Sequence, residues 1–434
     1  MKCTYRLLVL IGGVFSLLVM LGVTGDFTRI LDFRNPSSVS ESLRSEVKFG
    51  GFNKSVLTTA TQVHQQPFKI TEHPRTAYKT KLIPSNQEKK DKTVDLKALT
   101  PTVVHHEIKN TKKNFQSSVR STANKMVLAV VCCGDRLNET HIMLKSAAAL
   151  SHSPLMMIVF TEDPLKPIFE DMYASWPADV RERVSLNLHS IIFPPGQDAA
   201  AWRKLFKPCA SQRLFMPSLL KDVDALVYVD TDVVFLAPLE ELWSHFYKMN
   251  SSHMAAMAPE HEDLATGWYN RFAKHPYYGK LGVNSGVMLM NLTRLRKFGW
   301  EEYVVPIYRH YKLSITWGDQ DIINIIFHYH PDKLYVYGCE YNLRPDHCMY
   351  MSVCKAAEKR GVFVLHGNRG TFHSGKQPAF RAVYRAWEEY NLGQDLRQDL
   401  YYPMQRYLLK TSNTTCGKIH NAFLKALSSI VRLR

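Results

Sequence analysis

The sequence predicts an α/β fold with a central, mostly parallel sheet and helices on both faces. Two observations lead to this prediction. From residue 125 onward, apolar runs typical of buried parallel strands alternate with segments of helical spacing. One of these runs, Leu226–Phe235, contains two aspartates close to its end, at Asp230 and Asp232. Ligands of open α/β sheets bind at the ends of their strands, so this run is the starting point for function.

The order of elements is that of repeated strand–helix–strand units. Residues 126–133 form a fully apolar strand, and Gly134 and Asp135 then turn the chain into a helix. No Gly-x-Gly-x-x-Gly follows that strand and the chain has no P-loop motif, which argues against a dinucleotide-binding or P-loop fold. In chain order we expect strands at 126–133, 154–161, 184–193, 226–235, 282–291 and 362–366, and helices at 138–151, 165–176, 199–220, 238–247 and from 319 onward.

The two aspartates predict a metal site. Burying two carboxylates costs several kcal/mol each unless a positive group compensates them. A divalent cation is a common solution, because Mg²⁺ and Mn²⁺ prefer hard oxygen ligands and often bridge substrate phosphates. We therefore expect a metal–diphosphate site at Asp230 and Asp232, with an ordinary acidic turn as the alternative.

Three later stretches add polar groups to the same region of the expected sheet. The strand at 282–291 begins with small residues, which let a ligand approach its backbone at Asn284 and Ser285. Asp319 stands at the start of a helix, where capping alone could explain it. His366 ends a strand, where a neutral nitrogen could complete a metal site. The aromatic segment 268–278 suits stacking on a sugar and core packing equally well.

The N-terminal region predicts a membrane anchor followed by a stem. Lys2 and Arg6 precede a charge-free run at 7–23, and residues 24–124 have the composition of a disordered segment. We expect a cytoplasmic tail at 1–6, a signal anchor at 7–23, a luminal stem at 24–124 and a catalytic domain at 125–410 in the endoplasmic reticulum or Golgi. A cleaved signal peptide is the alternative.

Sequons and charge agree with a luminal glycoprotein. Five Asn-x-Ser/Thr sequons occur, and we expect glycosylation at Asn53, Asn250 and Asn413 but not at Asn138 or Asn291. The net charge of +16 comes without any nucleic-acid-binding motif, so we expect no nucleic-acid partner. The basic amphipathic segment 411–434 could lie on a membrane or, as we favour, pack on the catalytic domain. The loop cysteines Cys339, Cys348 and Cys354 could hold a disulfide of undetermined pairing.

Four motifs in order give the sequence its resemblance to a known family. They are strand–Asp-x-Asp, Asn-Ser-Gly-Val at 284–287, Gly-Asp-Gln-Asp at 318–321, and a strand-end His followed by a Lys near Pro at 366–378. From about Lys125 to about Leu392 the set resembles the GT-A fold glycosyltransferases of family 8. A closer resemblance, to the glucoside xylosyltransferases of that family, rests on Lys207–Phe215, Met257–Glu262, Gly267–Phe272, Arg344–Cys348 and Val364–Gly370.

The resemblance implies a retaining transfer of α-xylose from UDP-xylose to the 3-hydroxyl of O-linked glucose on EGF-like repeats of Notch-type proteins. Mn²⁺, with Mg²⁺ as the alternative, would be held by Asp230, Asp232 and His366, with His373 as the second choice for the histidine. Lys376 corresponds to a diphosphate-binding lysine, although the family's Lys-Pro is here Lys-Gln-Pro. The remaining implied contacts are Cys132, Arg213, Asp230, Asn284, Ser285 and Lys376 with the donor, and Glu260, His261 and Trp268 with the acceptor.

Asp319 and Gln320 are the implied catalytic residues. Either could act as a transient nucleophile or stabilise an oxocarbenium-like centre, or the diphosphate itself could take the acceptor's proton. Three rival hypotheses remain: a family member that uses another UDP-sugar, a non-catalytic glycan-binding protein of the same fold, and a haloacid-dehalogenase phosphatase. The phosphatase would place its Asp-x-Asp on the first strand, whereas three strand–helix units come earlier in this chain.

Overall fold

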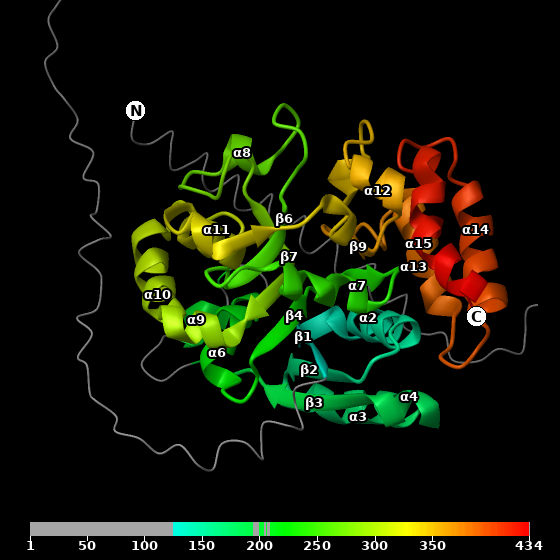
Figure 1. Ribbon diagram of the computed structural model, residues 1–434, viewed down its shortest axis with the longest axis horizontal. Coiled ribbons are helices and arrows are strands. Elements are labelled where there is room, and N and C mark those ends of the chain that lie inside the picture. Colours follow the sequence, from blue (N-terminus) through cyan, green and yellow to red (C-terminus); the bar gives the residue numbers. More distant parts are fainter. Residues whose placement is uncertain (1–124, 194–198, 204, 206–208, 434) are drawn as a thin grey trace, which may run out of the picture. The chain divides into compact units, whose positions relative to one another are not determined.

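The computed structural model describes residues 125–193, 199–203, 205 and 209–433, all within a compact unit at 105–434. A mixed seven-stranded sheet forms its centre, and its strand order is β3-β2-β1-β4-β7-β6-β8 (Figure 1). A second sheet consists of β5 and β9 alone. The strands are β1 Met126–Cys132, β2 Leu155–Thr161, β3 Val184–Ser190, β4 Ala225–Val229, β5 Val233–Phe235, β6 Ala255–Pro259, β7 Val283–Asn291, β8 Leu334–Val336 and β9 Val364–His366.

The main sheet is mostly parallel, as predicted. Strands β1 to β4 run in the same direction, and β6 is parallel to β8. The long strand β7 is the exception, because it pairs antiparallel with both β4 and β6. This reversal brings the beginning of β7, with Asn284 and Ser285, to the edge where β4 ends.

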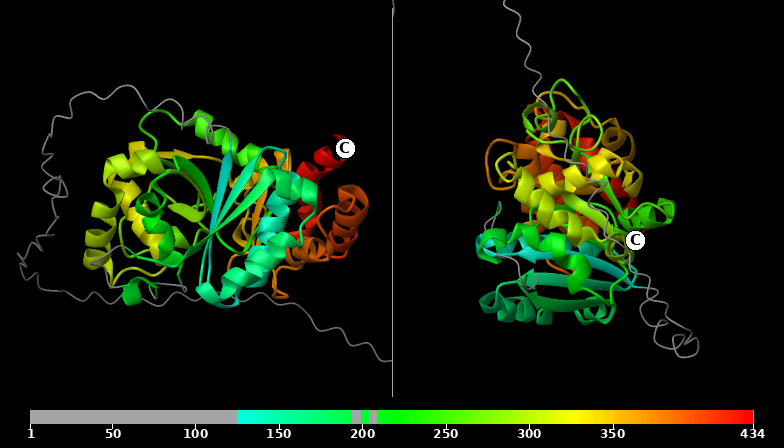
Figure 2. Two further views of the ribbon diagram at one scale, coloured as in Figure 1. Left: turned by 90° about the horizontal axis from the view of Figure 1, so that it is seen from below. Right: turned by 90° about the vertical axis from the view of Figure 1, so that its left-hand side faces the viewer.

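Helices cover both faces of the sheet (Figure 2). Alternate side chains of β1 enter two separate cores: Leu128 and Val130 pack with α2, α13 and α15, whereas Val127 and Ala129 pack with α9, α10 and α11. The α-helices are α2 Leu137–Leu150, α3 Lys166–Ala174, α4 Ala178–Arg183, α5 Ala199–Arg203, α6 Met216–Leu219, α7 Leu239–Trp243, α8 Tyr269–Phe272, α9 Leu292–Phe298, α10 Trp300–Tyr311, α11 Asp319–Tyr329, α12 Lys355–Arg360, α13 Pro378–Glu389, α14 Tyr402–Leu409 and α15 His420–Leu433.

The strand expected at 226–235 is broken in the structure. Strand β4 ends at Val229, and the chain then turns out of the main sheet at 230–232 before β5 pairs antiparallel with β9. The backbone N–H of Asp230 donates to the carbonyl of Gly286 at 2.9 Å, which ends the β4 ladder against β7. The turn places both aspartates outside a regular strand, so their carboxylates can converge on one point.

The single helix expected at 199–220 is wrong. The structure has the short helix α5, a 3₁₀ helix at Ala210–Phe215 (η4) and α6. Cys209 has a φ of +64°, a left-handed conformation that interrupts a right-handed helix, and Pro217 begins α6 anew. The apolar residues of this segment do face the core, since Trp202, Leu214 and Phe215 are all buried, but the segment forms three short helices and not one.

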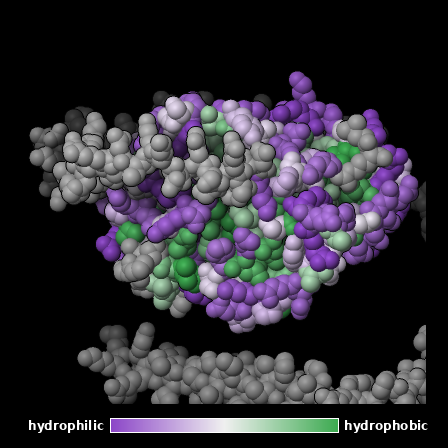
Figure 3. Space-filling model, turned by 60° about the horizontal axis from the view of Figure 1, so that its bottom comes forward, coloured by the Kyte–Doolittle hydropathy of each residue, from purple (hydrophilic) through white to green (hydrophobic). Residues whose placement is uncertain are grey.

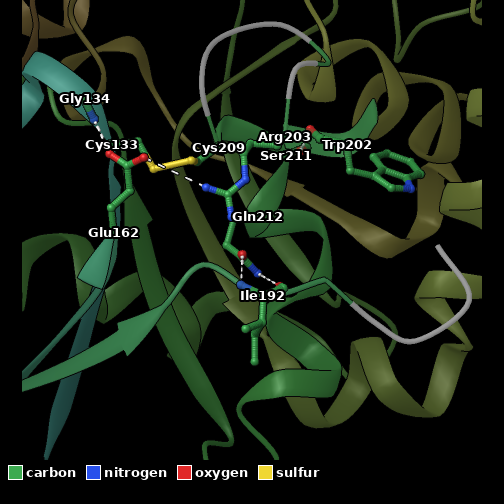
Figure 4. Close-up of a disulfide and its surroundings, with 9 residues drawn as sticks. All are labelled: Cys133, Gly134, Glu162, Ile192, Trp202, Arg203, Cys209, Ser211 and Gln212. Atoms are coloured by element: carbon green, nitrogen blue, oxygen red, sulfur yellow. Dashed lines mark hydrogen bonds and ion pairs between the residues drawn. A yellow bond between two sulfur atoms is a disulfide. The ribbon is translucent and has the colours of Figure 1, made fainter. Parts of the chain in front are cut away.

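Among the residues that the structure describes, three disulfides hold the loops around the sheet. Cys339 pairs with Cys354, which confirms a bridge within the predicted trio, and Cys348 pairs with Cys416. The third bridge joins Cys133, at the end of β1, to Cys209 (Figure 4). Each closes a segment without regular secondary structure to a strand or helix end.

The C-terminal helix α15 packs into the first core. Phe423 and Leu427 are fully buried, and the ring of Phe423 meets that of Phe380 on α13 edge to face. Its apolar face is therefore covered by the catalytic domain, as we favoured over membrane contact. Among the described residues no helix has the length and apolar character of a bilayer span, and the anchor expected at 7–23 lies outside them. Figure 3 shows the lower face of the domain, where hydrophilic side chains surround a hydrophobic area.

Candidate active site

Asp230, Asp232 and His366 lie together at the junction of the two sheets. The pairing of β5 with β9 puts Val233 opposite His366, which brings the histidine beside the 230–232 turn. One ligand atom from each of the three residues lies within 4.8 Å of the others. The Nε2 atom of His366 is 3.3 Å from Asp232 Oδ1 and 3.8 Å from Asp230 Oδ2. Two hard oxygen donors and one imidazole nitrogen suit a divalent cation such as Mn²⁺ or Mg²⁺.

A second layer of hydrogen bonds orients the histidine. His366 Nδ1 lies 2.9 Å from Asn342 Oδ1, and the amide of Asn342 donates to Asn284 Oδ1 at 2.8 Å. Because an amide oxygen only accepts, this contact assigns the proton to Nδ1 and leaves the lone pair on Nε2, toward the two carboxylates. The chemistry of the donor set therefore fits a bound metal.

Gly286 explains why the Asn-Ser-Gly motif contains a glycine. A Cβ atom at this position would lie 2.2 Å from His366 Cε1 and 2.9 Å from Asp230 Oδ2. No side chain can occupy that space without moving a metal-ligand candidate. The close approach of β7 to the 230–232 turn thus depends on this residue.

Arg213 forms a buried charged centre beside Asp230 and Asp319. Its buried guanidinium bonds to Asp319 through Nε, donates to the carbonyl of Ser285 at 2.5 Å through Nη1, and lies 3.3 Å from Asp230 Oδ1. It also stacks over the Tyr228 ring, 4.6 Å from the centroid. Burial raises the pKa of Asp319, and Arg213 opposes that shift. The Asp319 carboxylate is therefore held in a buried ion pair with Arg213.

Gln320 and Asn284 meet at the partly buried carboxylate of Glu260. Glu260 Oε2 accepts from the Asn284 amide at 2.7 Å and from the Gln320 amide at 3.2 Å. Gln320 Oε1 in turn accepts from Asn284 at 3.1 Å and from the backbone N–H of Ser285 at 3.2 Å. Arg344, fully buried, donates to Glu260 Oε1 at 2.6 Å. The ion pair fixes the orientation of both amides.

The comparisons with known proteins decide the family. A model of "Glycosyl transferase family 8" matches residues 116–361, more than half of the chain. The chain belongs to glycosyl transferase family 8. Glucoside xylosyltransferase 2 of Mus musculus is 52% identical over 316 residues, which cover 70% of this chain and 71% of that protein. Glucoside xylosyltransferase 1 of Homo sapiens is 51% identical over 321 residues, or 71% of this chain and 72% of that protein. The resemblance seen in the sequence is confirmed.

Solved structures with a related fold are more distant. Mouse xyloside xylosyltransferase 1 in its apo form is 19% identical with a TM-score of 0.42, and covers 57% of this chain and 99% of that one. An active-site mutant of LgtC is 15% identical with a TM-score of 0.49, and covers 63% of this chain and 100% of that one. The family match and the observed sheet support a GT-A-like glycosyltransferase fold for the described region.

Two other residues expected in this family 8 site lie in the loop between β9 and α13. Lys376 is exposed, and His373 lies 2.8 Å from Glu139 Oε1. The structure thus pairs His373 with Glu139 and places His366 in the metal set. Glu139 is buried and also contacts Thr231 Oγ1 at 3.3 Å, so it joins this loop to the 230–232 turn.

Cys132, expected to contact the donor, and His261 and Trp268, expected to contact the acceptor, differ in their exposure. The Cys132 thiol is buried, and burial raises its pKa to about 11. His261 is also buried, with Nε2 3.4 Å from the carbonyl of Asp346. Trp268 is about half exposed and stacks on Phe272. A donor contact at Cys132 would have to come from its main chain.

The structure gives the exposure of four of the five sequon asparagines. Asn250 and Asn413 are exposed, and Asn53 lies outside the described residues. Asn291 caps helix α9 by accepting from the N–H of Arg294, which agrees with our doubt about its modification. Asn138 is exposed at the start of α2, so burial gives no reason to exclude it.

Sequence reasoning missed three residues that organise the site: Glu139, Asn342 and Arg344. Arg344 stood within a stretch quoted for the family resemblance, but nothing there indicated its contact with Glu260. Asn342 stands in an irregular segment without a recognisable pattern. A motif search would find neither, since both act through partners distant in sequence.

Proposed function

We propose that this family 8 enzyme transfers xylose from UDP-xylose to O-linked glucose on EGF-like repeats of Notch-type proteins. The observation that supports a metal-dependent sugar-nucleotide reaction most strongly is the convergence of Asp230, Asp232 and the free Nε2 of His366. The names of the relatives at 51–52% identity support glucose as the acceptor and xylose as the transferred sugar.

Mn²⁺ is the proposed cofactor, with Mg²⁺ as the alternative, held by Asp230, Asp232 and His366. When bound, such an ion stabilises negative charge that develops on a leaving diphosphate. Lys376, exposed on the loop after β9, is the proposed lysine contact of the same diphosphate. Arg213 offsets part of the negative charge of Asp230 and Asp319, which helps the pocket to accept an anion.

We assign Gln320, and not Asp319, to the face of the transferred sugar. The Asp319 carboxylate is buried and bonded to Arg213, so its oxygen is unavailable as a nucleophile. Gln320 is held by Asn284, Ser285 and Glu260 at the partly buried edge of the site. A fixed amide dipole there would stabilise an oxocarbenium-like centre, with the diphosphate taking the acceptor's proton and retention at the anomeric carbon.

A luminal location in the endoplasmic reticulum or Golgi completes the proposal, with the chain anchored through 7–23. Three disulfides among the described residues support an oxidising compartment. The exposed sequons at Asn250 and Asn413 are compatible with it.

A donor screen on the full-length chain tests the function. UDP-xylose, UDP-glucose and UDP-galactose are compared with an O-glucosylated EGF-like repeat and Mn²⁺, using wild type, Asp232→Asn and Asp332→Asn. Asp332 is largely exposed and pairs with Lys333, so its substitution controls for loss of a carboxylate. We expect xylose transfer that falls at least about 100-fold in Asp232→Asn alone.

Each other outcome selects an alternative. Preferred transfer from another UDP-sugar would keep the site but reject the xylose assignment. Donor binding without turnover would support the non-catalytic protein. Transfer that survives Asp232→Asn and EDTA would reject the metal site.

A further inference from the structure

Two loops rise from the candidate active site and lie against each other. The first runs from Glu260 to Gly282 and is closed at its base, because the N–H of Glu260 donates to the carbonyl of Gly282 at 2.9 Å. The second follows Arg344, whose guanidinium bonds to Glu260. The ring of His261 in the first loop lies 5.7 Å from that of His347 in the second. Both loops project from the same edge of the domain, near α8 and α12 (Figure 1).

Both loops are held firmly. In the first, the Tyr269 hydroxyl donates to Asp321 Oδ1 at 2.7 Å, and His275 Nε2 lies 3.2 Å from the same oxygen. Asp321 follows Gln320 directly on α11, so this loop is fastened to the helix that carries the expected catalytic amide. The second loop contains Cys348 and ends at Cys354, and both cysteines are in disulfides. A surface on such loops is ordered before a partner arrives, which lowers the entropic cost of binding.

The tips of the two loops expose large apolar side chains. Leu264, Trp268 and Phe272 are 50%, 47% and 47% exposed in the first loop, and Tyr350 and Met351 are 67% and 58% exposed in the second. The Trp268 and Phe272 rings stack with centroids 5.0 Å apart, and the Arg271 guanidinium lies over both. Aromatic residues, Met and Arg are the types enriched in protein–protein interfaces. An exposed cluster of this kind marks an interaction site more often than chance packing.

We propose that these five side chains, Leu264, Trp268, Phe272, Tyr350 and Met351, form a docking surface for the polypeptide of the acceptor. This inference rests on the proposed function. A single O-linked glucose is short, so the polypeptide that carries it must come to the rim of the site when the sugar reaches Gln320. Glu260 contacts both Gln320 and Arg344, so that rim lies at the base of the two loops that carry the docking surface. Its occupant is therefore a small folded protein domain that bears one sugar.

The test compares two acceptors that share the sugar and differ in the polypeptide. One is a folded, O-glucosylated EGF-like repeat, and the other is p-nitrophenyl β-glucoside. The full-length variants are Leu264→Ser with Phe272→Ala, and Tyr350→Ser with Met351→Ser. Tyr247→Ala is the matched control, because Tyr247 is an aromatic residue that is 84% exposed outside both loops.

We expect each double variant to lose about 10-fold or more in kcat/KM on the folded repeat, through KM. Activity on the small glucoside and the KM for UDP-xylose should change less than about twofold, as should all values for Tyr247→Ala. Equal losses on both acceptors would overturn the proposal, because the side chains would then serve the sugar or the fold. Unchanged activity on the folded repeat would overturn it too.

Two further results separate this inference from its alternatives. A wild-type chain that self-associates, with the association lost in the double variants and kcat/KM on the repeat retained, would identify the docking surface as a contact between copies and refute our assignment. A wild-type chain that transfers xylose to neither acceptor would refute the proposed function, and the docking surface with it. If only the docking proposal is wrong, the wild-type chain still transfers xylose.

Discussion

Substituting Gly286 by alanine should damage the metal site without removing any polar group. The added Cβ would lie 2.2 Å from His366 Cε1, 2.8 Å from His366 Nδ1 and 2.9 Å from Asp230 Oδ2. His366 cannot turn away freely, because its Nδ1 is bonded to Asn342. We expect the strain to lower the free energy of unfolding by about 1–3 kcal/mol, as in other overpacked sites.

The larger effect should fall on metal affinity. Moving His366 away breaks its bond with Asn342 and separates Nε2 from Asp232, and the loss of such an orienting contact weakens metal binding by about 10–100-fold. At saturating wild-type Mn²⁺, a 30-fold weaker site loses about 2 kcal/mol of metal-dependent stabilisation. The measurement is the rise of Tm with Mn²⁺ concentration, followed by Mn²⁺ titration of xylose transfer.

Gly375→Ala provides the matched control. A Cβ at Gly375 would meet nothing within 4 Å, although this glycine lies in the loop that carries Lys376. Its Mn²⁺-dependent rise in Tm should equal that of wild type. A Gly286→Ala protein that binds Mn²⁺ with wild-type affinity would show that His366 is not a ligand, and would refute the reasoning.

Three further predictions concern the ion pair, a buried histidine and a disulfide. Glu260→Gln and Arg344→Met should each lower the free energy of unfolding by about 3–5 kcal/mol in a denaturant titration, because each removes one partner of an ion pair in which Arg344 is fully buried and Glu260 is partly buried. The double variant should regain most of that stability but not kcat, and a double variant as unstable as the singles would contradict this. Burial lowers the pKa of His245 from 6.5 to about 4, so between these pH values the unfolded chain binds more protons than the folded chain, and stability falls as pH drops through that window. The variant His245→Phe should make Tm less dependent on pH between pH 4 and 6.5. An unchanged dependence of Tm on pH would exclude His245 as its source. Replacing Cys133 and Cys209 by serine should lower the free energy of unfolding by about 4 kcal/mol and raise the KM for UDP-xylose, because the bridge fixes the segment that carries Arg213. An unchanged KM would show that the disulfide contributes to stability alone.

The sequence predicted strands such as β1, β2 and β7 and singled out Asp230 and Asp232 because these signals are local, but it missed the short strands β6 and β8. Buried strands such as β1 and β2 are uninterrupted apolar runs, and Asp230 and Asp232 stand out because carboxylates rarely follow such a run closely. Strand direction is not a local property, so the reversal of β7 could not be read from its apolar residues. The error at 199–220 has a similar cause, since helical spacing there persists across Cys209, whose left-handed backbone is set by a bridge to β1.

The contacts that connect the two halves of the site could not be predicted, and they explain the position of the disulfides. Asn342 links the metal histidine to Asn284, and Arg344 fixes the carboxylate that orients Gln320. Both lie between β8 and β9, in the short connection between two 3₁₀ helices at Cys339–Tyr341 and Pro345–His347. Cys339 and Cys348 flank this segment, and their bridges to Cys354 and Cys416 restrict it from both ends. Oxidation of these cysteines therefore positions Asn342 and Arg344, which in turn orient His366 and Gln320.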